Sequence, residues 1–560
     1  PTEVGTEAGN YRLRIISEEP NGKSSWIDYA DLRPAYDSGI VMRNYFDRYR
    51  TPDLTSFPNP GAHQNFVLKN GRIVEGIGKG IKYRAIHKGS GGLMEIDNVY
   101  TEVSGVDSSN FWGEYSSNTI FRNSTSVNRA AGVTNRHALD NFPVFSGSNM
   151  KFYNNIIEGG QGGVSTAGFN NVEIYNNTFR INASFTNHYA VTTYESDNIR
   201  VYNNRFEPYH GPGILFSSRT TNSQIYNNYF NFKNMGPIAE YTDGFYTTSA
   251  IRVTDYNSTE VNSQTQNNKI FDNVVIGTAQ SLSQYPNFKA TAIGLNLSTG
   301  GYNEYYHNDI RVTRLDNKAE AIAVKGSAIQ IGLLKENRLS SNHINVWLGT
   351  NYGPSANGNF VSNTFIRGIE PIDYHTLKIG YWTSAAENHT FLDTKFENGA
   401  SLSDIKLGAA SGGGNYSFYV KWYLDILVKD SFGNPIPDAA ITATATGGAA
   451  ETVSKITDAS GKARLELTEY YRYGITYPPT SNYNNYTPHN VTISKSGYPT
   501  ESKTLTMDSS KEMTVILAGT EPPALEQDFA SDFTQVKAYP NPFRGDKHNQ
   551  IIFDNLTANV

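Results

Sequence analysis

A short alternation of apolar and polar residues recurs along the chain. In "VEIYNNTF", Val172 and Ile174 alternate with polar residues and are followed by Tyr-Asn-Asn. Nearly the same skeleton returns as "MKFYNNII" (150–157), "IRVYNNRF" (199–206) and "SQIYNNYF" (223–230). Alternation with a period of two predicts short strands with one buried face. We therefore expect the apolar residue pairs Met150/Phe152, Val172/Ile174 and Ile199/Val201 to point inward.

The Tyr of this skeleton serves as a phase marker for a longer repeat. With Tyr175 as the reference, about twelve markers occur roughly 22 to 35 residues apart, with one gap of about 45. The others are Leu68, Ile96, Phe121, Tyr153, Tyr202, Tyr226, Phe271, Tyr306, Lys335, Val361 and Phe391. Another alternating segment lies in each repeat, for example "AVTTYE", "AIGLNL" and "HINVWL". Neither a leucine-rich nor a helical repeat pattern is present, so the period predicts a β-solenoid of about twelve coils.

The Asn residues of the skeleton have a role of their own. Asn tolerates the left-handed backbone of tight turns, and its amide can bond to an identical amide one strand spacing away. We expect Asn155, Asn177, Asn204 and Asn228 to form such a ladder. In these features residues 61–410 resemble the right-handed parallel β-helix proteins of the pectate-lyase-like superfold. That resemblance and the general right-handed crossover rule imply the handedness.

The two ends of the chain differ in texture from this repeat. Residues 1–60 carry more charges and aromatics and are expected to cap the solenoid. After the flexible "GAASGGGNYS", the segments "GNPIPDAAITAT" and "TDASGKARLEL" resemble small β-sandwich modules of the carboxypeptidase-regulatory-like or immunoglobulin-like type, over 416–518. Residues 519–560 read as a linker followed by "YPNPF", which is similar to the start of a bacterial C-terminal sorting-type β-domain.

Composition narrows the function classes. Gly (49) and Tyr (37) are abundant and 18% of residues are charged, which favours an all-β protein. The net charge of −6 without a basic stripe argues against nucleic-acid binding. Because the chain has no cysteine, disulfides and thiol nucleophiles are excluded. There is no apolar run long enough to span a membrane and no leader pattern at the start of the sequence. The "YPNPF" resemblance implies export, so we expect an extracellular or cell-surface protein whose signal has been removed.

Counting from the markers predicts which polar residues face outward. One outward column would hold Asp140, Ser165, Thr192, Arg252, Asn345 and Lys378, and the next would hold Tyr194, Asn296, Lys325 and Trp347. Asp140 and Glu195 fall too far apart laterally for the carboxylate pair of a glycosidase. Glu195 and Arg219 precede their markers by the same number of residues, which predicts an inter-coil salt bridge. The alternative for Arg219 is a clamp on a sugar carboxylate.

Three histidines, His137, His188 and His210, fall near the start of the same strand on neighbouring coils. A polysaccharide lyase needs a base that removes the proton α to a uronate carboxylate and a cation that neutralises this carboxylate. His188 with Tyr194 and Arg219 would meet that need. The alternative is turn histidines bonded to neighbouring loops, and neither the clustered aspartates of a pectate lyase nor polygalacturonase motifs are present.

Several aromatic residues are candidates for sugar binding. We expect Trp347, Tyr381 and Trp382, with Lys325, to offer stacking and charged contacts, although exposed rings on a β-helix are also ordinary surface packing. No cofactor and no metal ligand set is indicated. Glu240 and Asp243 in "EYTDGF" would suit Ca²⁺, but no regular calcium loop follows them.

Two functions therefore remain open. The first is a secreted or cell-surface β-helix protein with a structural, adhesive or polysaccharide-binding role, which binds extracellular glycans and can self-associate. The second is an enzyme acting on acidic glycans, a polysaccharide lyase in preference to a hydrolase.

Overall fold

The computed structural model describes most of the solenoid and the domain that follows it. The described residues are 38–42, 66–74, 84–88, 93–103, 109–114, 117–129, 140–160, 162–181, 189–207, 213–234, 248–255, 264–281, 283, 289–328, 330–350, 353–408, 412–519, 537–539 and 552–554. They contain strands and no α-helix, and so no helix among them is long and apolar enough to cross a membrane. The chain divides into two units: Pro1–Trp422 with Thr468–Asn485, and Tyr423–Leu467 with Tyr486–Val560.

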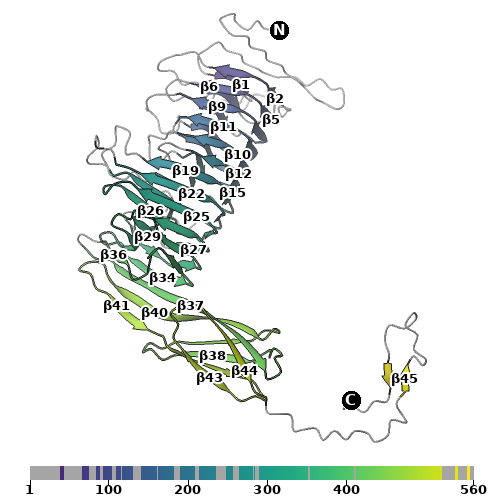
Figure 1. Cartoon of the computed structure of the whole chain (residues 1–560). Coiled ribbons are helices and arrows are strands. Elements are labelled where there is room, and N and C mark those ends of the chain that lie inside the picture. Colours follow the sequence, from purple (N-terminus) through teal and green to yellow (C-terminus); the bar gives the residue numbers. More distant parts are fainter. Residues whose placement is uncertain are drawn as a thin grey trace, which may run out of the picture. The chain divides into compact units, whose positions relative to one another are not determined.

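The first unit is a right-handed parallel β-helix, as predicted, with three columns of strands (Figure 1). The first column contains β1 (Ser38–Met42), β4 (Arg84–Lys88), β7 (Ser109–Glu114), β14 (Val191–Tyr194), β17 (Ile214–Ser217), β20 (Thr248–Thr254), β23 (Thr291–Ser298), β26 (Glu320–Gly326), β29 (Ile344–Leu348), β33 (His375–Ile379) and β36 (Ile405–Leu407). The long strands β10 (Asp140–Tyr153) and β12 (Gly162–Tyr175) run through both the first and the second column.

The second column contains β2 (Phe66–Lys69), β5 (Met94–Asp97), β8 (Thr119–Arg122), β15 (Asp197–Tyr202), β18 (Gln224–Tyr226), β21 (Lys269–Phe271), β24 (Glu304–Tyr306), β27 (Gly332–Lys335), β30 (Ser355–Ala356), β31 (Gly358–Val361) and β34 (Ala386–Leu392). The third contains β3 (Arg72–Val74), β6 (Tyr100–Val103), β9 (Thr125–Asn128), β11 (Ile156–Gly159), β13 (Thr178–Arg180), β16 (Arg205–Phe206), β19 (Tyr229–Asn234), β22 (Val274–Ala279), β25 (Asp309–Arg314), β28 (Arg338–Ser341), β32 (Thr364–Arg367) and β35 (Lys395–Glu397). Its 12 strands, one for each coil among the described residues, agree with the predicted coil number.

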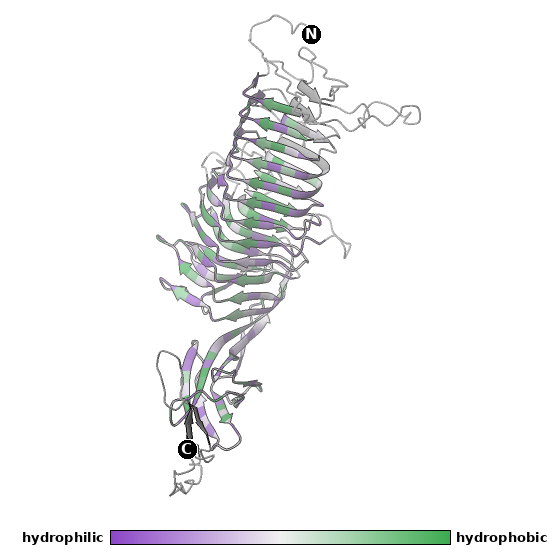
Figure 2. Ribbon diagram, turned by 90° about the vertical axis from the view of Figure 1, so that its right-hand side faces the viewer, coloured by the Kyte–Doolittle hydropathy of each residue, from purple (hydrophilic) through white to green (hydrophobic). Residues whose placement is uncertain are grey.

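The interior of the solenoid is apolar, and hydrophobic residues recur from coil to coil (Figure 2). The predicted inward residues are all fully buried: Met150, Phe152, Val172, Ile174, Ile199 and Val201. The third column contributes a stack of Phe179, Phe206 and Phe230, with ring centroids 4.8 and 4.6 Å apart. Because each ring packs against the equivalent ring of the next coil, the core is continuous along the solenoid.

The two Asn residues of the repeated turn do different work. The first one, for example Asn176 with φ 55°, takes the left-handed conformation that lets the chain turn. The second one donates from Nδ2 to Oδ1 of the next coil's Asn, so that Asn177 bonds Asn204 at 3.0 Å. The predicted ladder of Asn155, Asn177, Asn204 and Asn228 is confirmed, and it continues through Asn273, Asn308, Asn337 and Asn363.

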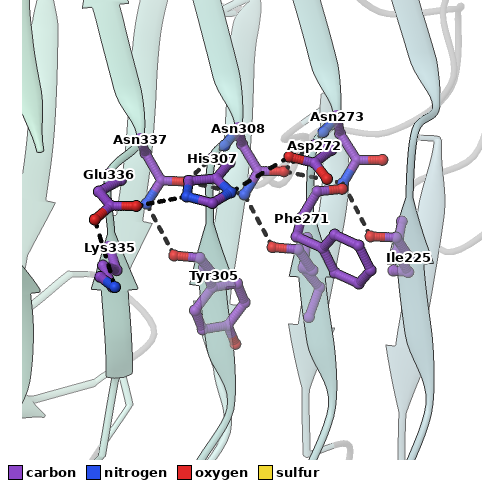
Figure 3. A network of polar contacts seen from close by, with 11 residues as sticks. Ile225, Phe271, Asp272, Asn273, Tyr305, His307, Asn308, Lys335, Glu336 and Asn337 are labelled. Atoms are coloured by element: carbon purple, nitrogen blue, oxygen red, sulfur yellow. Dashed lines mark hydrogen bonds and ion pairs between the residues drawn. The ribbon is translucent and has the colours of Figure 1, made fainter. Parts of the chain in front are cut away.

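Figure 3 shows part of this ladder, at Asn273, Asn308 and Asn337. Each amide also donates to a backbone carbonyl of the preceding coil, as Asn308 does to Ile270 at 2.9 Å. Each Oδ1 accepts the backbone N–H of the preceding ladder Asn as well, so these buried amides are satisfied on both sides.

The Tyr markers also align as predicted. Tyr153, Tyr175, Tyr202, Tyr226, Phe271 and Tyr306 form a half-buried stack with centroids 4.8 to 4.9 Å apart. Four other markers were one residue early, because the true partners of Leu68, Ile96, Phe121 and Phe391 in the repeat are Lys69, Asp97, Arg122 and Leu392. In these four coils the marker position holds a non-aromatic residue, and the inward apolar residue just before it was mistaken for the marker.

The ends of the solenoid are described in part. Within the predicted cap, 1–60, only β1 is described, and it pairs in parallel with β4 as a further first-column strand. Beyond residue 410, strand β37 (Asn415–Asp430) pairs in parallel with β34. The solenoid pairing therefore extends past the predicted end, and the boundary between the two units falls inside β37. Strand β41 (Asn482–Asn485) pairs with residues 470–473 of β40 (Lys462–Ile475) in the first unit.

The second unit is also built of strands. It has a four-stranded antiparallel sheet of β39 (Thr452–Ile456), β38 (Ala440–Ala445), β42 (His489–Ser494) and β43 (Glu501–Leu505). The remaining parts of β37 and β40, with β44 (Lys511–Leu517), complete its described core. Its likeness to immunoglobulin-like or carboxypeptidase-regulatory-like modules stays a prediction. So does a sorting-type domain around the hairpin β45 (Lys537–Tyr539) and β46 (Ile552–Asp554).

Removal of one rung should measure what the Asn ladder contributes. Asn273→Ala deletes the acceptor of Asn228 and the donor to Asn308, and it leaves buried polar groups without partners. We expect the free energy of unfolding to fall by about 2 to 4 kcal/mol, measured by urea denaturation followed by circular dichroism. Asn359→Ala, at an exposed position of β31, is the control and should change it by less than about 0.5 kcal/mol. Equal effects of the two substitutions would contradict a stabilising ladder.

Candidate functional site on the first strand column

The catalytic candidates taken from the sequence are only partly described. His137, His188 and His210 lie outside the described residues. Asp140 begins β10, where its backbone lies opposite Gly162, and its side chain is outside the description. Tyr194 ends β14 and is half-buried. Arg219 forms the predicted salt bridge with Glu195, at 2.6 Å and about half exposed.

The outward residues of the first column are arranged differently from the prediction. Arg252 lies opposite Asn296, and Asn296 lies opposite Lys325. Trp347 and Lys378 continue the same row on the next two coils. Residues expected in two separate columns therefore form one, which runs as Ser165, Thr192, Leu215, Arg252, Asn296, Lys325, Trp347 and Lys378.

Three predicted residues, Tyr194, Asn345 and Asp140, do not belong to this row. Tyr194 lies opposite Ala167 and Ser217, two positions after Thr192. Asn345 is fully buried and donates its amide to the carbonyls of Leu339 in its own coil and Ile366 in the next, so its side chain is bonded inside the solenoid. Asp140 lies opposite Gly162, three residues before Ser165, which is the member of the row on β12. The division into two columns was wrong. Thr192 and Lys325 precede their markers by the same number of residues and belong together, whereas Arg252, Trp347 and Lys378 lie farther from theirs because the turns after them are longer.

Trp347 is the centre of the row. Its side chain is 4% exposed, in contrast to the exposed stacking platform expected from the sequence. The ammonium of Lys378 lies 3.5 Å from the centroid of its ring, and that of Lys325 lies 5.0 Å away. These are cation–π contacts, which gain strength when they are shielded from water. We call Arg252, Asn296, Lys325, Trp347 and Lys378 the Trp347 cluster.

The lysines of the Trp347 cluster have altered acidity. Burial lowers the pKa of Lys325 to about 7 and the pKa of Lys378 to about 8. Glu320 lies 3.9 Å from the Lys378 ammonium and also pairs with Lys289. Burial raises the pKa of Glu320, but the two lysines outweigh it and the net direction is downward. At neutral pH the site therefore holds an ionised carboxylate and two lysines that lose protons readily.

Asn296 is the least satisfied polar residue of the cluster. Its side chain is fully buried, and neither its amide oxygen nor its amide nitrogen has a hydrogen-bond partner in the described structure. An unpaired buried amide costs about 1 to 3 kcal/mol, so such groups are rare without a purpose. Its neighbour Arg252 donates to the hydroxyl of Tyr189 at 3.4 Å. Asn296 thus offers one donor and one acceptor between two cationic side chains.

Apolar and aromatic side chains adjoin the Trp347 cluster. Ile293, Ile322 and Ile344 pack with Trp347, and Tyr381 lies against it with its ring at 6.1 Å in an edge-to-face arrangement. Trp382 stacks on Tyr381 at 5.6 Å and is 61% exposed. The four binding candidates predicted from the sequence, Lys325, Trp347, Tyr381 and Trp382, are therefore contiguous in space.

Two buried histidines can be assigned structural roles. Burial lowers the pKa of His343 to about 3, and its Nδ1 accepts the backbone N–H of Ala321. His389 lies 3.1 Å from the Ser355 hydroxyl, but its Nδ1 accepts from Gly358. The proton of neutral His389 is therefore on Nε2, which donates to Ser355 and cannot deprotonate it.

Four residues at or near the Trp347 cluster were not predicted as site residues, although the sequence contained a signal for them. Arg252, Asn296, Glu320 and Lys378 are polar residues in or at the start of strands that are otherwise apolar, such as "AIRVT" and "AIGLNL". A single charged side chain in a strand buried on both faces needs a partner or a function.

Metal binding finds little support in the described structure. The residues placed there contain no group of three or more His, Asp or Glu that could hold a metal ion. Glu240 and Asp243, the Ca²⁺ candidates, lie outside the described residues.

Comparison with known proteins shows distant likeness. A family model described as periplasmic copper-binding protein (NosD) matches residues 62–263. The described part of that stretch contains no group of three or more His, Cys, Asp or Glu that could hold a metal ion. The tailspike protein of E. coli bacteriophage HK620, solved in complex with a pentasaccharide, is similar at 10% identity with a TM-score of 0.33, over 77% of this chain and 85% of the tailspike chain.

A second solved structure is a tailspike protein from Acinetobacter baumannii bacteriophage Fri1, a capsular polysaccharide depolymerase. It is 9% identical with a TM-score of 0.16, over 70% of this chain and 73% of that one. No curated protein matches.

Replacement of Lys325 should show that the Trp347 cluster costs stability. Because its folded pKa lies below the unfolded value of about 10.4, the unfolded state binds more protons between pH 7 and pH 10. Stability of the native protein should therefore rise with pH through this window. Lys325→Met should remove much of that rise and stabilise the protein at pH 7 by on the order of 2 to 4 kcal/mol. Denaturation midpoints measured from pH 6 to 10 test this.

The matched control is Lys395→Met, on an exposed position of β35. It should leave the pH dependence of the midpoint unchanged. A Lys325→Met protein that is less stable than the native protein at pH 7 would contradict a strained lysine.

Proposed function

We propose that this protein is an extracytoplasmic β-helix protein that binds a carboxylate-bearing polysaccharide at the Trp347 cluster. The observation that carries the proposal is the buried Lys325 beside Asn296, an amide without partners, with the largely covered Lys378 further along the same row of the first column. A carboxylate placed there would gain charge-assisted hydrogen bonds and would satisfy the cluster. The amide would bond a neighbouring hydroxyl.

A carbohydrate suits this site better than other anions do. Sugar hydroxyls both donate and accept, as the Asn296 amide requires, and the aromatic residues beside the cluster suit the apolar faces of sugar rings. The net charge of −6 gives no general attraction for nucleic acid. A location outside the cytoplasm is supported by the periplasmic description of the matched family, and the "YPNPF" resemblance favours an extracellular or cell-surface one.

The binding hypothesis is tested with defined glycans. Calorimetric titration with polygalacturonate, hyaluronan and neutral dextran should detect binding of at least one acidic polymer and none of dextran. Lys378→Met should weaken that binding about tenfold or more, because it removes a buried charge partner of the carboxylate. Lys395→Met should not. Affinity should fall as pH rises from 6 to 9, since Lys325 and Lys378 deprotonate in this window. Binding whose affinity changes neither with Lys378→Met nor with pH would refute the site.

A second function, a polysaccharide lyase, is favoured by one observation. A lysine with a pKa of about 7 is partly neutral at physiological pH and can act as a base. In β-elimination, Lys325 Nζ would remove the proton α to the carboxylate. The electron pair then forms a C=C bond as the glycosidic C–O bond breaks, and the leaving oxygen takes up a proton. Arg252 and Lys378 would stabilise the enolate-like charge.

A glycosidase is less well supported than a lyase. It needs a carboxylic acid with a raised pKa. Glu320 has a lowered pKa because Lys378 and Lys289 outweigh its burial. Asp373 has a lowered pKa because it accepts a hydrogen bond from Lys406 at 2.7 Å. Both carboxyl groups near Lys378 are therefore ionised at neutral pH.

The lyase hypothesis predicts a rate that rises with pH. Release of unsaturated sugars, followed by ultraviolet absorbance on saturating acidic polymer, should increase through about pH 7 as Lys325 loses its proton. Lys325→Met should abolish the release while the protein stays folded. Bound polymer without any unsaturated product would leave binding as the function and exclude the lyase.

Self-association, also expected from the sequence, stays a prediction. The stacked coils expose charged corners such as that of Asp272, His307 and Glu336, where His307 pairs with both carboxylates (Figure 3). These contacts are satisfied within the chain, so they give no reason for a second copy to bind there.

A further inference from the structure

Trp382 is held in an unusual position for a large apolar residue. Gly380 (φ 84°), Tyr381 and Trp382 are consecutive residues of a tight turn. Tyr381 and Ser384 form a β-bridge across this turn. Trp382 itself has φ 53°, a conformation that bulky residues rarely adopt. Its side chain is 61% exposed. The chain thus accepts both backbone strain and exposure of an indole at one place, and such combinations gather at functional sites.

One face of the Trp382 ring is supported and the other is open. Tyr381 stacks beneath it, with planes inclined by 6° and centroids 5.6 Å apart. Tyr381 in turn contacts Trp347, whose indole N–H donates to the Gly380 carbonyl at 3.4 Å. The turn that carries Trp382 is therefore attached directly to the Trp347 cluster, through Tyr381 and the Gly380 carbonyl.

The other aromatic row of the solenoid cannot serve the same purpose. In the stack from Tyr153 to Tyr306 each ring lies 4.8 to 4.9 Å from the next, with planes inclined by 3 to 5°. Both faces of the inner rings are covered by their neighbours. A sugar ring needs an open aromatic face, which this stack lacks and Trp382 has.

We propose that Trp382, backed by Tyr381, is a second subsite that stacks the uncharged sugar ring next to the carboxylated sugar bound at the Trp347 cluster. The inference rests on the proposed function and narrows its ligand. The face of an indole carries partial negative charge, so it attracts the polarised C–H groups of a pyranose and disfavours a carboxylate. The preferred ligand is then a polymer in which charged and uncharged sugars are neighbours, and not a continuous polyuronate.

The test uses a substitution that keeps the turn. Asn adopts positive φ readily, so Trp382→Asn removes the ring without straining the backbone. Phe432→Ala, at an 85% exposed residue of the second unit, is the control for loss of an exposed ring. The calorimetric probes are a hyaluronan hexasaccharide, in which glucuronate and N-acetylglucosamine alternate, a galacturonate hexasaccharide, and free glucuronate.

We expect Trp382→Asn to lower the affinity for the alternating hexasaccharide by roughly tenfold and to leave the affinity for free glucuronate unchanged. Trp382→Phe should recover part of the loss, and Phe432→Ala should have no effect. The thermal midpoint of Trp382→Asn should equal or exceed that of the native protein, which a merely structural ring would not allow.

Three results would overturn the inference. If the native protein binds acidic probes and Trp382→Asn binds the alternating hexasaccharide equally well, the second subsite is refuted while the proposed function stands. The same holds if galacturonate hexasaccharide binds more tightly than the alternating one. If no acidic probe binds to the native protein, the proposed function fails and the subsite fails with it.

Discussion

Register between coils is the constraint on which the rest of this structure depends. Parallel strands hold it through their backbone hydrogen bonds, and the Asn ladder supports it at the turns between the second and third columns from Asn155 to Asn363. A ladder amide bonds the next ladder amide and a carbonyl of the preceding coil. A slip of one residue would break these bonds and turn apolar side chains outward. The repeat is thus a device for keeping coils aligned.

The same register assembles the candidate site. Arg252, Asn296, Lys325, Trp347 and Lys378 come from five successive first-column strands and carry no common motif. Because stacked strands lie about 4.8 Å apart, residues far apart in the chain become neighbours on one face. Burial then changes their chemistry, since desolvation lowers the pKa of both lysines.

The Trp347 cluster gathers several features that lower the stability of the protein. Two buried ammonium groups on one indole, an unpaired amide and a strained Trp382 each raise the energy of the unliganded protein. A long solenoid tolerates such local costs, because each coil is held mainly by its neighbours and the ladder is intact on both sides. The carboxylate of Glu320 lessens the cost, although it serves two lysines at once.

The sequence alone determined the solenoid, its approximate coil number, the inward pairs such as Val172 and Ile174, the Asn ladder and the Glu195–Arg219 salt bridge. All of these depend on a short period within one strand and turn, and adjacent coils repeat it with little change. Lys325 and Trp347 could also be selected, as polar or aromatic residues at outward positions of apolar strands, and Tyr381 and Trp382 as aromatic residues expected at the surface.

Tertiary structure alone decided how the outward residues align. Counting from Tyr175 separated Lys325 from Lys378 and placed Asn345 outside, because turns of unequal length lie between the marker and the first column. The burial of Trp347 could not be predicted either, because nothing in the sequence shows whether water or Lys378 covers its ring. A sequence period records what each coil repeats, whereas a binding site depends on what neighbouring coils place opposite each other.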